Sequence, residues 1–344
     1  MAPSLGALLV GEVLPRVLVI AVAIAGGVAI ADLLVAFGAV DYVAALSEPL
    51  TGPANLPDEV GGAILTTAAS TTAGYGMLAE YRDSGLLDDR ATLVAVIINT
   101  FFGFVQHIST FYAPVLIPIL GLRVGLLYVG FRAGIALAIT LSGVAAGAVL
   151  LGPGNVDPDA MVEVEADARA DGGEAAGDDR EDGESDAEDE EPSTTRGKLV
   201  DAAATGLGKT RDILPRLVVV YAVVAALTAY YDLEALTGGA ADPLASLTGL
   251  PSAAVPVIVV SAVDTTSGAV TIAPLIEDGV FTARTAVATM LLGGIVSFTV
   301  STFKRSIPFQ FGIWGAEFGT KVVLVNTALK VVWIAAALVA LLAW

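Results

Sequence analysis

The sequence has 344 residues, of which 55% are hydrophobic and only 15% charged, and its mean hydropathy is +0.77. Soluble domains carry about a quarter charged residues, so this composition excludes an ordinary water-soluble protein. The absence of cysteine excludes disulfides, thiolate metal sites and cysteine nucleophiles. Few Lys residues beside abundant Ala, Val, Gly and Asp give the chain a halophilic composition.

The acidic charge is concentrated in one segment. Of the 36 acidic residues, 17 lie between Gly152 and Thr195, together with two of the 17 basic residues, so the rest of the chain has a net charge of only −4. The segment has no aromatic residue and cannot bury enough surface to offset its ordering entropy. We predict a disordered acidic linker over 152–197, between membrane regions at 1–151 and 198–344.

The two membrane regions repeat each other. Val13–Arg16 (VLPR) returns 200 residues later as Ile213–Arg216 (ILPR), and Ser70–Gly74 (STTAG) returns 194 residues later as Asp264–Gly268 (DTTSG). Several Gly, Arg, Phe and Pro positions continue the second register, and such matches are rarely accidental. The sequence therefore predicts two related repeats in one chain.

Each repeat is expected to contain the same elements in the same order. A short amphipathic surface helix (5–13; 199–213) precedes a first span that starts at Leu-Pro-Arg. The remaining elements are a second span (58–80; 252–276) interrupted by Thr-Thr-x-Gly, a charged turn (82–90; 277–284), a third span (91–109; 285–302), an apolar piece broken by Pro and Gly (111–122; 306–318), and a final span (124–151; 322–343).

The expected fold class is an all-α polytopic membrane protein with 8–10 transmembrane helices, including broken or re-entrant ones. The apolar piece is too short to span unless it fuses with the final span after it. Its course decides whether the repeats are parallel or inverted, which stays open. Basic residues at the end of the linker and just after it, such as Arg196 and Lys198, place the linker on the cytoplasmic side of the cell membrane by the positive-inside rule.

The two interrupted spans are the first candidate site. A helix broken within lipid leaves backbone groups without partners, which is tolerated only inside protein or beside a wet cavity. Paired breaks in two repeats indicate the binding site of a transporter. The alternative is that small residues merely allow close helix packing. The candidate solute- or ion-binding residues at the breaks are Ser70, Thr71, Thr72, Asp264, Thr265, Thr266 and Ser267.

Asp264 makes the two breaks chemically unequal, because its counterpart is Ser70. A carboxylate in the middle of a span is costly and suggests an ion, proton or substrate contact. We expect Asp264 to couple an ion or proton to solute movement. The alternative is a structural ion pair with Lys304 or Arg305.

Other polar residues lie in apolar surroundings. His107 is the only histidine, so a histidine metal cluster is excluded, and it is either an interfacial residue or a ligand contact. Lys304 and Arg305 could bind an anionic solute, although basic residues at span ends usually extend to lipid headgroups. Asn99 and Gln310 complete the candidate binding residues, while Asn326 and Lys330 are expected to tie helices together.

Glu317 and Lys321 are four residues apart, so a helix would pair them. A membrane-embedded hydrolase is disfavoured because no nucleophile–base set is visible, and we expect no enzyme activity. We also expect no resident metal or cofactor and no nucleic-acid partner, since no basic face or ATP-binding element is present.

The motifs resemble those of the nucleoside-recognition (Gate) domain family of membrane proteins. The residues that carry the resemblance in the first repeat are Leu14-Pro15, Ser70–Gly74, Asp83–Gly85 and Ser109–Tyr112, and in the second Leu214-Pro215, Asp264–Gly268, Glu277–Gly279 and Ser301–Phe303. The second repeat departs from the pattern, because Lys304 follows Phe303 where the first has Tyr112. The resemblance implies two Gate-like repeats and a nucleoside-like solute.

The preferred hypothesis is a secondary transporter of a small polar solute with a site near mid-membrane, driven either by a coupling ion or proton or by the gradient of the solute itself. Its partners would be the lipid bilayer and the solute, and homo-oligomers are possible. The rival hypothesis is a non-transporting membrane scaffold or accessory protein that uses the acidic linker to bind partners. A polar-lined cavity at the broken helices would favour transport, and a packed core would favour the scaffold.

Overall fold

The computed structural model describes residues 4–36, 48–157, 160, 195–230, 248–301 and 306–343. This part of the chain is helical, and its only β-type pairing is an isolated bridge between Leu87 and Val156. Three of its helical stretches are long and apolar enough to cross a membrane: Asp89–Leu120, Leu122–Leu150 and Phe309–Leu342. The predicted all-α class is confirmed, and these three stretches indicate a membrane protein.

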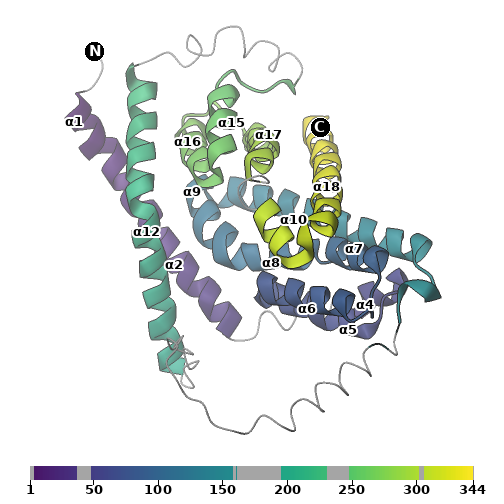
Figure 1. The fold of residues 1–344 in the computed structure, drawn as a ribbon. Helices are drawn as coiled ribbons and strands as arrows, with labels where there is room; N and C mark the ends of the chain where they lie inside the picture. Colours follow the sequence, from purple (N-terminus) through teal and green to yellow (C-terminus); the bar gives the residue numbers. More distant parts are fainter. Residues whose placement is uncertain are drawn as a thin grey trace.

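The helices before the acidic segment are coloured from purple to teal in Figure 1. Their bounds are α1 Leu5–Leu8, η1 Leu9–Val13, α2 Leu14–Ala36, α4 Glu48–Thr51, η2 Gly52–Ala54, α5 Asp58–Ala69, α6 Thr71–Asp83, α7 Asp89–Ile98, α8 Thr100–His107, η3 Ile108–Leu116, α9 Ile117–Leu120, α10 Leu122–Leu150 and η4 Pro153–Asn155. The helices after it are α12 Thr195–Tyr230, α15 Ala254–Val263, α16 Thr265–Glu277, α17 Ala283–Ser301 and α18 Ile307–Leu342.

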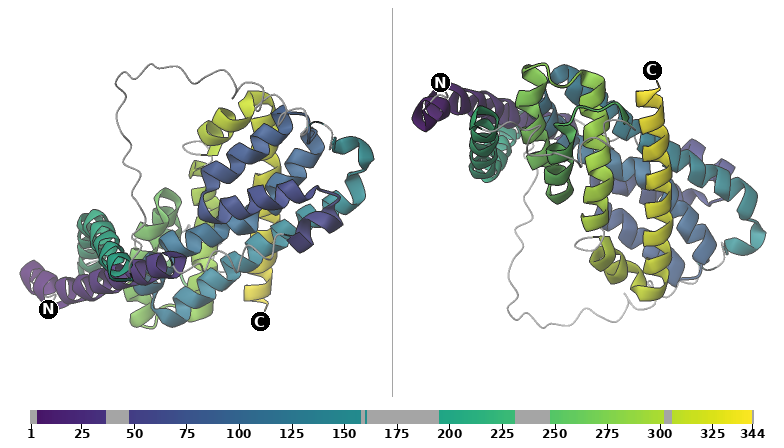
Figure 2. Two further views of the ribbon diagram at one scale, coloured as in Figure 1. Left: turned by 90° about the horizontal axis from the view of Figure 1, so that it is seen from below. Right: turned by 90° about the horizontal axis from the view of Figure 1, so that it is seen from above.

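The lead-in segments differ from the prediction of separate surface helices. Residues 5–13 run directly into α2, and α12 continues through Pro215 as one helix of 36 residues. A helix can continue through a proline because the residue removes only one backbone hydrogen-bond donor. Before Pro15, the π-helical turn η1 replaces the usual i to i+4 hydrogen bonds with i to i+5 bonds. α2 and α12 pack along each other at one side of the molecule (Figures 1 and 2).

The apolar piece at 111–122, whose course the sequence left open, joins the helix before it rather than the final span after it. α7, α8, η3 and α9 form one helical stretch that ends at Gly121 (φ 76°, ψ 157°). A Cβ atom on Gly125 would lie 2.8 Å from the Cα of Ile117, so α10 folds back sharply at this corner. Gly315 has nearly the same backbone angles (φ 71°, ψ 168°) inside α18.

α5 and α6 form a tight helical hairpin rather than a kinked rod. Only Ser70, in extended conformation (φ −141°, ψ 109°), separates the two helices. A Cβ atom on Gly74 would lie 2.6 Å from the carbonyl oxygen of Ala63. Eleven residues of continuous helix would put about 16 Å between these positions. The chain therefore reverses at Ser70.

The second half contains a matching hairpin of α15 and α16. Asp264, also extended (φ −156°, ψ 129°), is the single residue between the two helices. A Cβ atom on Gly268 would lie 2.8 Å from the Cα of Ser261, which again requires the chain to reverse. Gly293 of α17 would come within 2.5 Å of the Ser261 Cβ if it carried a side chain, so the hairpin packs tightly on α17.

Two apolar clusters make up the described core. The larger joins α2, η3, α9, α10, α15, α16, α17 and the C-terminal part of α18. The smaller packs α5, α6 and α7 around Trp314 and Phe318 of α18. α18 therefore contributes to both clusters, whereas large apolar side chains such as Leu126, Leu141 and Val332 remain exposed on the outer surface.

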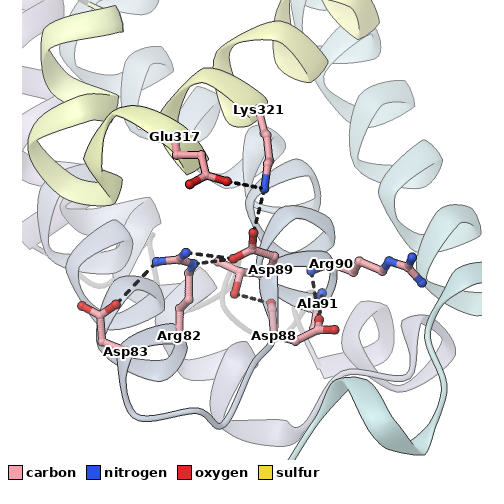
Figure 3. Close-up of polar contacts among 9 residues, drawn as sticks. Arg82, Asp83, Asp88, Asp89, Arg90, Ala91, Glu317 and Lys321 are labelled. Atoms are coloured by element: carbon pink, nitrogen blue, oxygen red, sulfur yellow. Dashed lines mark hydrogen bonds and ion pairs between the residues drawn. The ribbon is translucent and has the colours of Figure 1, made fainter.

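An ion-pair cluster also connects α18 to the first half (Figure 3). Asp89 accepts from Arg82 at 2.8 Å and from Lys321 at 3.0 Å. The predicted pair of Glu317 and Lys321 is confirmed, with an N–O distance of 3.6 Å.

Hydrogen bonds hold the segment just before α7 next to the segment just after α10. The backbone N–H of Asp88 donates to the carbonyl of Asn155 at 3.1 Å, and that of Asp157 donates to the carbonyl of Leu86 at 3.0 Å. The side-chain amide of Asn155 donates to the Asp88 carboxylate at 2.7 Å.

Candidate functional site

A polar cavity of about 240 Å³ lies where the α5–α6 hairpin meets three long helical stretches. α6 supplies its lining at the hairpin tip, and the remainder comes from the Asp89–Leu120 stretch, from α10 and from α18 with the residue before it. The polar lining residues are Thr71, Tyr75, Asn99, Thr100, His107, Tyr112, Arg132, Ser306, Gln310, Asn326 and Lys330.

The hairpin tip presents the N-terminus of α6 to the cavity. Ser70 caps this helix, because its hydroxyl oxygen accepts from the backbone N–H of Ala73 at 3.3 Å. The Thr71 hydroxyl donates to the side-chain oxygen of Gln106 at 2.5 Å, which fixes the tip against α8. The extended Ser70 thus ends one helix, begins the next and brings Thr71 to the cavity wall.

Tyr75 holds the other side of the hairpin against α18. Its ring packs on Phe309 and Trp314 with centroid distances of 5.8 and 6.1 Å. The Trp314 indole N–H donates to the side-chain oxygen of Gln310 at 2.6 Å. These contacts link the hairpin tip to the segment before the Gly315 corner.

Asn99 lies at the junction of α7 and α8 and is 1% exposed. Its side-chain amide N–H donates to Thr67 Oγ1 at 2.8 Å, and the Thr67 hydroxyl donates to the Ala63 carbonyl at 3.0 Å. Because the Thr67 proton is used, Asn99 must present its amide nitrogen to Thr67 and its oxygen elsewhere. Asn99 Oδ1 is buried and has no hydrogen-bond partner among the described residues.

Thr140 supports the same junction from α10. Its hydroxyl donates to the carbonyl of Ile98 at 2.7 Å and accepts from the backbone N–H of Phe101 at 3.1 Å. Thr140 thereby provides hydrogen-bond partners for backbone groups on both sides of the junction. Backbone groups need such partners in a lipid environment, where water is absent.

Arg132 carries a permanent positive charge into the cavity from the middle of α10. Its guanidinium donates to the Tyr112 hydroxyl at 3.1 Å. Lys330 of α18 and His107 of α8 line the same cavity. Asn326 precedes Lys330 by one helical turn, so both side chains project from the same face.

Four predicted site residues come together in this cavity: Thr71, Asn99, His107 and Gln310. Ser70 is next to the lining and caps α6, whereas Thr72 is exposed and not part of the lining. Lys304 and Arg305 lie outside the described residues, immediately before Ser306 in the chain.

The predicted residues of the second break do not line this cavity. Asp264 caps α16, with one carboxylate oxygen accepting from the backbone N–H of Ser267 at 2.7 Å and from its hydroxyl at 2.9 Å. Thr266 is buried, and Thr265 is half-buried at the start of α16. A pairing of Asp264 with Lys304 or Arg305 concerns residues outside the described part of the chain.

The sequence reasoning missed Arg132 and assigned Asn326 and Lys330 only a structural role. A signal was present, because Arg132 is one of two charged residues in α10 and Lys330 is the only charged residue after Lys321. A charge in the centre of an apolar stretch is a functional-site hypothesis by default. Among the described residues, no group of three or more His, Asp or Glu could hold a metal ion.

Two curated proteins of Methanocaldococcus jannaschii are similar to this chain. The uncharacterized protein MJ0871 is 24% identical over 264 residues, which cover 76% of this chain and 72% of that protein. The uncharacterized protein MJ0880 is 20% identical over 323 residues, covering 93% and 95% of the two chains. No family model matches the chain, and no solved structure matches it.

Proposed function

We propose that this protein is a secondary membrane transporter for a small polar solute. The observation that carries the proposal is the polar cavity of about 240 Å³ at the tip of the α5–α6 hairpin, among helices long and apolar enough to cross a membrane. A packed scaffold has no need for buried amide, hydroxyl and cationic groups around an open space, because each costs free energy to desolvate.

The architecture we propose is that of two related repeats, each with a re-entrant hairpin. α5 and α6 have 12 and 13 residues, about 18 and 20 Å of helix, which is less than the ~30 Å hydrocarbon core. The single extended residue at each tip and the paired corners at Gly121 and Gly315 support the duplication. We place the protein in the cell membrane with 8–10 crossings and a cytoplasmic acidic linker.

The solute is small, because drug-sized ligands occupy pockets of about 300–1,000 Å³. A nucleoside-like compound is the class suggested by the resemblance to Gate-domain proteins. Asp264, at the tip of the second hairpin, is our candidate for the residue that couples an ion or proton to movement.

The test is solute-dependent stabilisation followed by flux. Purified protein is heated with nucleosides, nucleobases, amino acids or organic acids, since a ligand that binds the folded state raises its melting temperature. Any compound that stabilises the protein is then used for uptake into proteoliposomes. Thr71→Val, at the cavity wall, should weaken both responses, whereas Thr72→Val, one residue away and outside the lining, should not. A protein that is folded but neither binds nor moves any of these compounds would favour the scaffold function.

A further inference from the structure

We infer that the solute of this cavity is a small oxyanion that also carries hydrogen-bond donors, with its negative group held between Arg132 and Lys330. The inference rests on the proposed transporter function and assigns it a substrate class different from the nucleoside-like compound that the resemblance suggests. A hydroxy or amino carboxylate and a small phosphate ester share this chemistry.

The first support is the depth of the two cations. Arg132 lies ten residues after Leu122 at the start of α10, or about 15 Å along the helix, and Lys330 lies about 18 Å before Leu342 at the end of α18. In helices of this length both charges lie well inside a ~30 Å hydrocarbon core. Cations at that depth are costly and are retained where they meet an anion.

The second support is the charge of the lining. In the described part of the chain, the cavity wall contains Arg132 and Lys330 but no Asp or Glu. The hydroxyl that Arg132 contacts is that of Tyr112, a neutral acceptor at 3.1 Å, so this contact leaves the positive charge uncompensated. The N-terminus of α6, which begins at Thr71, adds partial positive charge at the hairpin tip.

The third support is a pair of buried acceptor atoms on residues that line the cavity. Asn99 Oδ1 and Asn326 Oδ1 are buried and lack hydrogen-bond partners among the described residues, and both residues line the cavity. An amide oxygen accepts but does not donate, so these atoms require N–H or O–H donors from the solute. A bare inorganic anion such as chloride would satisfy the cations but not these oxygens.

The position of Asn326 relative to Lys330 sets the size of the solute. One helical turn, about 5–6 Å, separates the two side chains on α18. This spacing matches a molecule whose donor group is a few bonds away from its oxyanion, as in 2-hydroxy and 2-amino acids or glycerol 3-phosphate.

The experiment measures affinity by thermal stabilisation and by uptake into proteoliposomes for L-malate, L-glutamate, glycerol 3-phosphate and the neutral compounds uridine and glycerol. We expect a carboxylate or the phosphate ester to stabilise the wild type. Comparison of L-malate and L-glutamate with glycerol 3-phosphate shows whether the site takes a carboxylate or a phosphate. Arg132→Gln and Lys330→Gln should each weaken binding at least about tenfold, the usual effect of losing a charge-assisted bond. Arg123→Gln, on the exposed first turn of the same helix, should leave binding unchanged.

Two further variants distinguish loss of charge from loss of structure. Arg132→Lys preserves the charge and should retain more affinity than Arg132→Gln, which separates loss of the cation from loss of packing. Succinate lacks the hydroxyl of malate, so the wild type should prefer malate, and Asn326→Leu should abolish that preference without abolishing anion binding.

The outcomes separate the two proposals. Binding and uptake of uridine alone, unaffected by Arg132→Gln, would overturn the anion inference and leave the transporter function intact. Anion binding that depends on Arg132 but produces no uptake would support the site and refute transport. Failure of every anion to bind the folded protein would refute the anion inference, whereas the transporter function would still be decided by the wider set of solutes given for it above.

Discussion

Lys321 Nζ lies 3.0 Å from Asp89 Oδ2, so a residue of α18 reaches the first residue of α7 across 232 positions of sequence. Arg82 approaches the other oxygen of the same carboxylate at 2.8 Å. Asp89 therefore joins the turn after the first hairpin to the second half of the chain, and Figure 3 shows the three side chains converging.

Asp89→Asn should lower the melting temperature, because it removes the negative charge that both cations share. Loss of the partly exposed pair with Arg82 costs on the order of 0.5 kcal/mol. Glu317→Gln is the matched control, since its carboxylate is 92% exposed and should contribute nothing measurable. The difference between the variants, measured by thermal unfolding in detergent, should shrink at high salt. Equal melting temperatures at low salt would show that the cluster does not join the halves.

Gly74→Ala should destabilise the protein strongly, by about 2 kcal/mol or more, because the new Cβ would lie 1.9 Å from Thr67 Oγ1 and force the hairpin apart. Gly76→Ala is on the same helix and meets nothing within 4 Å. It should be neutral or stabilising by up to about 1 kcal/mol, since Ala favours helix over Gly. Thermal unfolding of both variants tests the chain reversal at Ser70. An unchanged Gly74→Ala protein would mean that α5 and α6 do not pack face to face.

Thr67→Val should cost about 1–3 kcal/mol, because it leaves the buried Asn99 amide N–H without its acceptor. The neighbouring Thr66 hydroxyl donates to the Gly62 carbonyl of its own helix, so Thr66→Val should cost less. Unfolding measurements on both single variants, and on Thr67→Val combined with Asn99→Leu, give the coupling between the residues. Strictly additive losses would contradict the bond.

Asp264→Asn should remove any pH or sodium dependence of uptake while leaving the fold intact, because asparagine is as good an N-cap as aspartate. Asp264→Ala should in addition lose about 1 kcal/mol of stability, since it also removes the cap on Ser267. Uptake at several pH values and sodium concentrations, beside thermal unfolding, separates the two effects. Unaltered ion dependence in Asp264→Asn would end the coupling hypothesis and leave the cap as the role of this residue.

The sequence predicted the elements well where the signal was local. Long uncharged runs predicted the helices, the small polar residues around Ser70 and Asp264 predicted where helices end, and the four-residue spacing predicted the pair of Glu317 and Lys321. These features depend on the chemistry of a few adjacent residues.

Features that depend on tertiary packing were harder to predict. A reversal at Ser70 and a kink at Ser70 need the same small residues, and only the close approach of Gly74 to Ala63 distinguishes them. The cavity is lined by residues of α6, α8, η3, α10 and α18, so no single stretch of sequence predicts it. Arg132 stands out within the apolar α10, but its place beside Tyr112 and Lys330 depends on how α10 packs against η3 and α18.

The short ladder between residues 86–88 and 155–157 has a consequence for sidedness. In the membrane arrangement that we propose, the hydrogen bond between Asp157 and Leu86 places the start of the acidic segment on the same face of the membrane as the Ser84–Asp88 turn. A protease or impermeant label applied to sealed vesicles should therefore reach the turn and the start of the acidic segment together or neither of them, in whichever orientation the vesicles have formed.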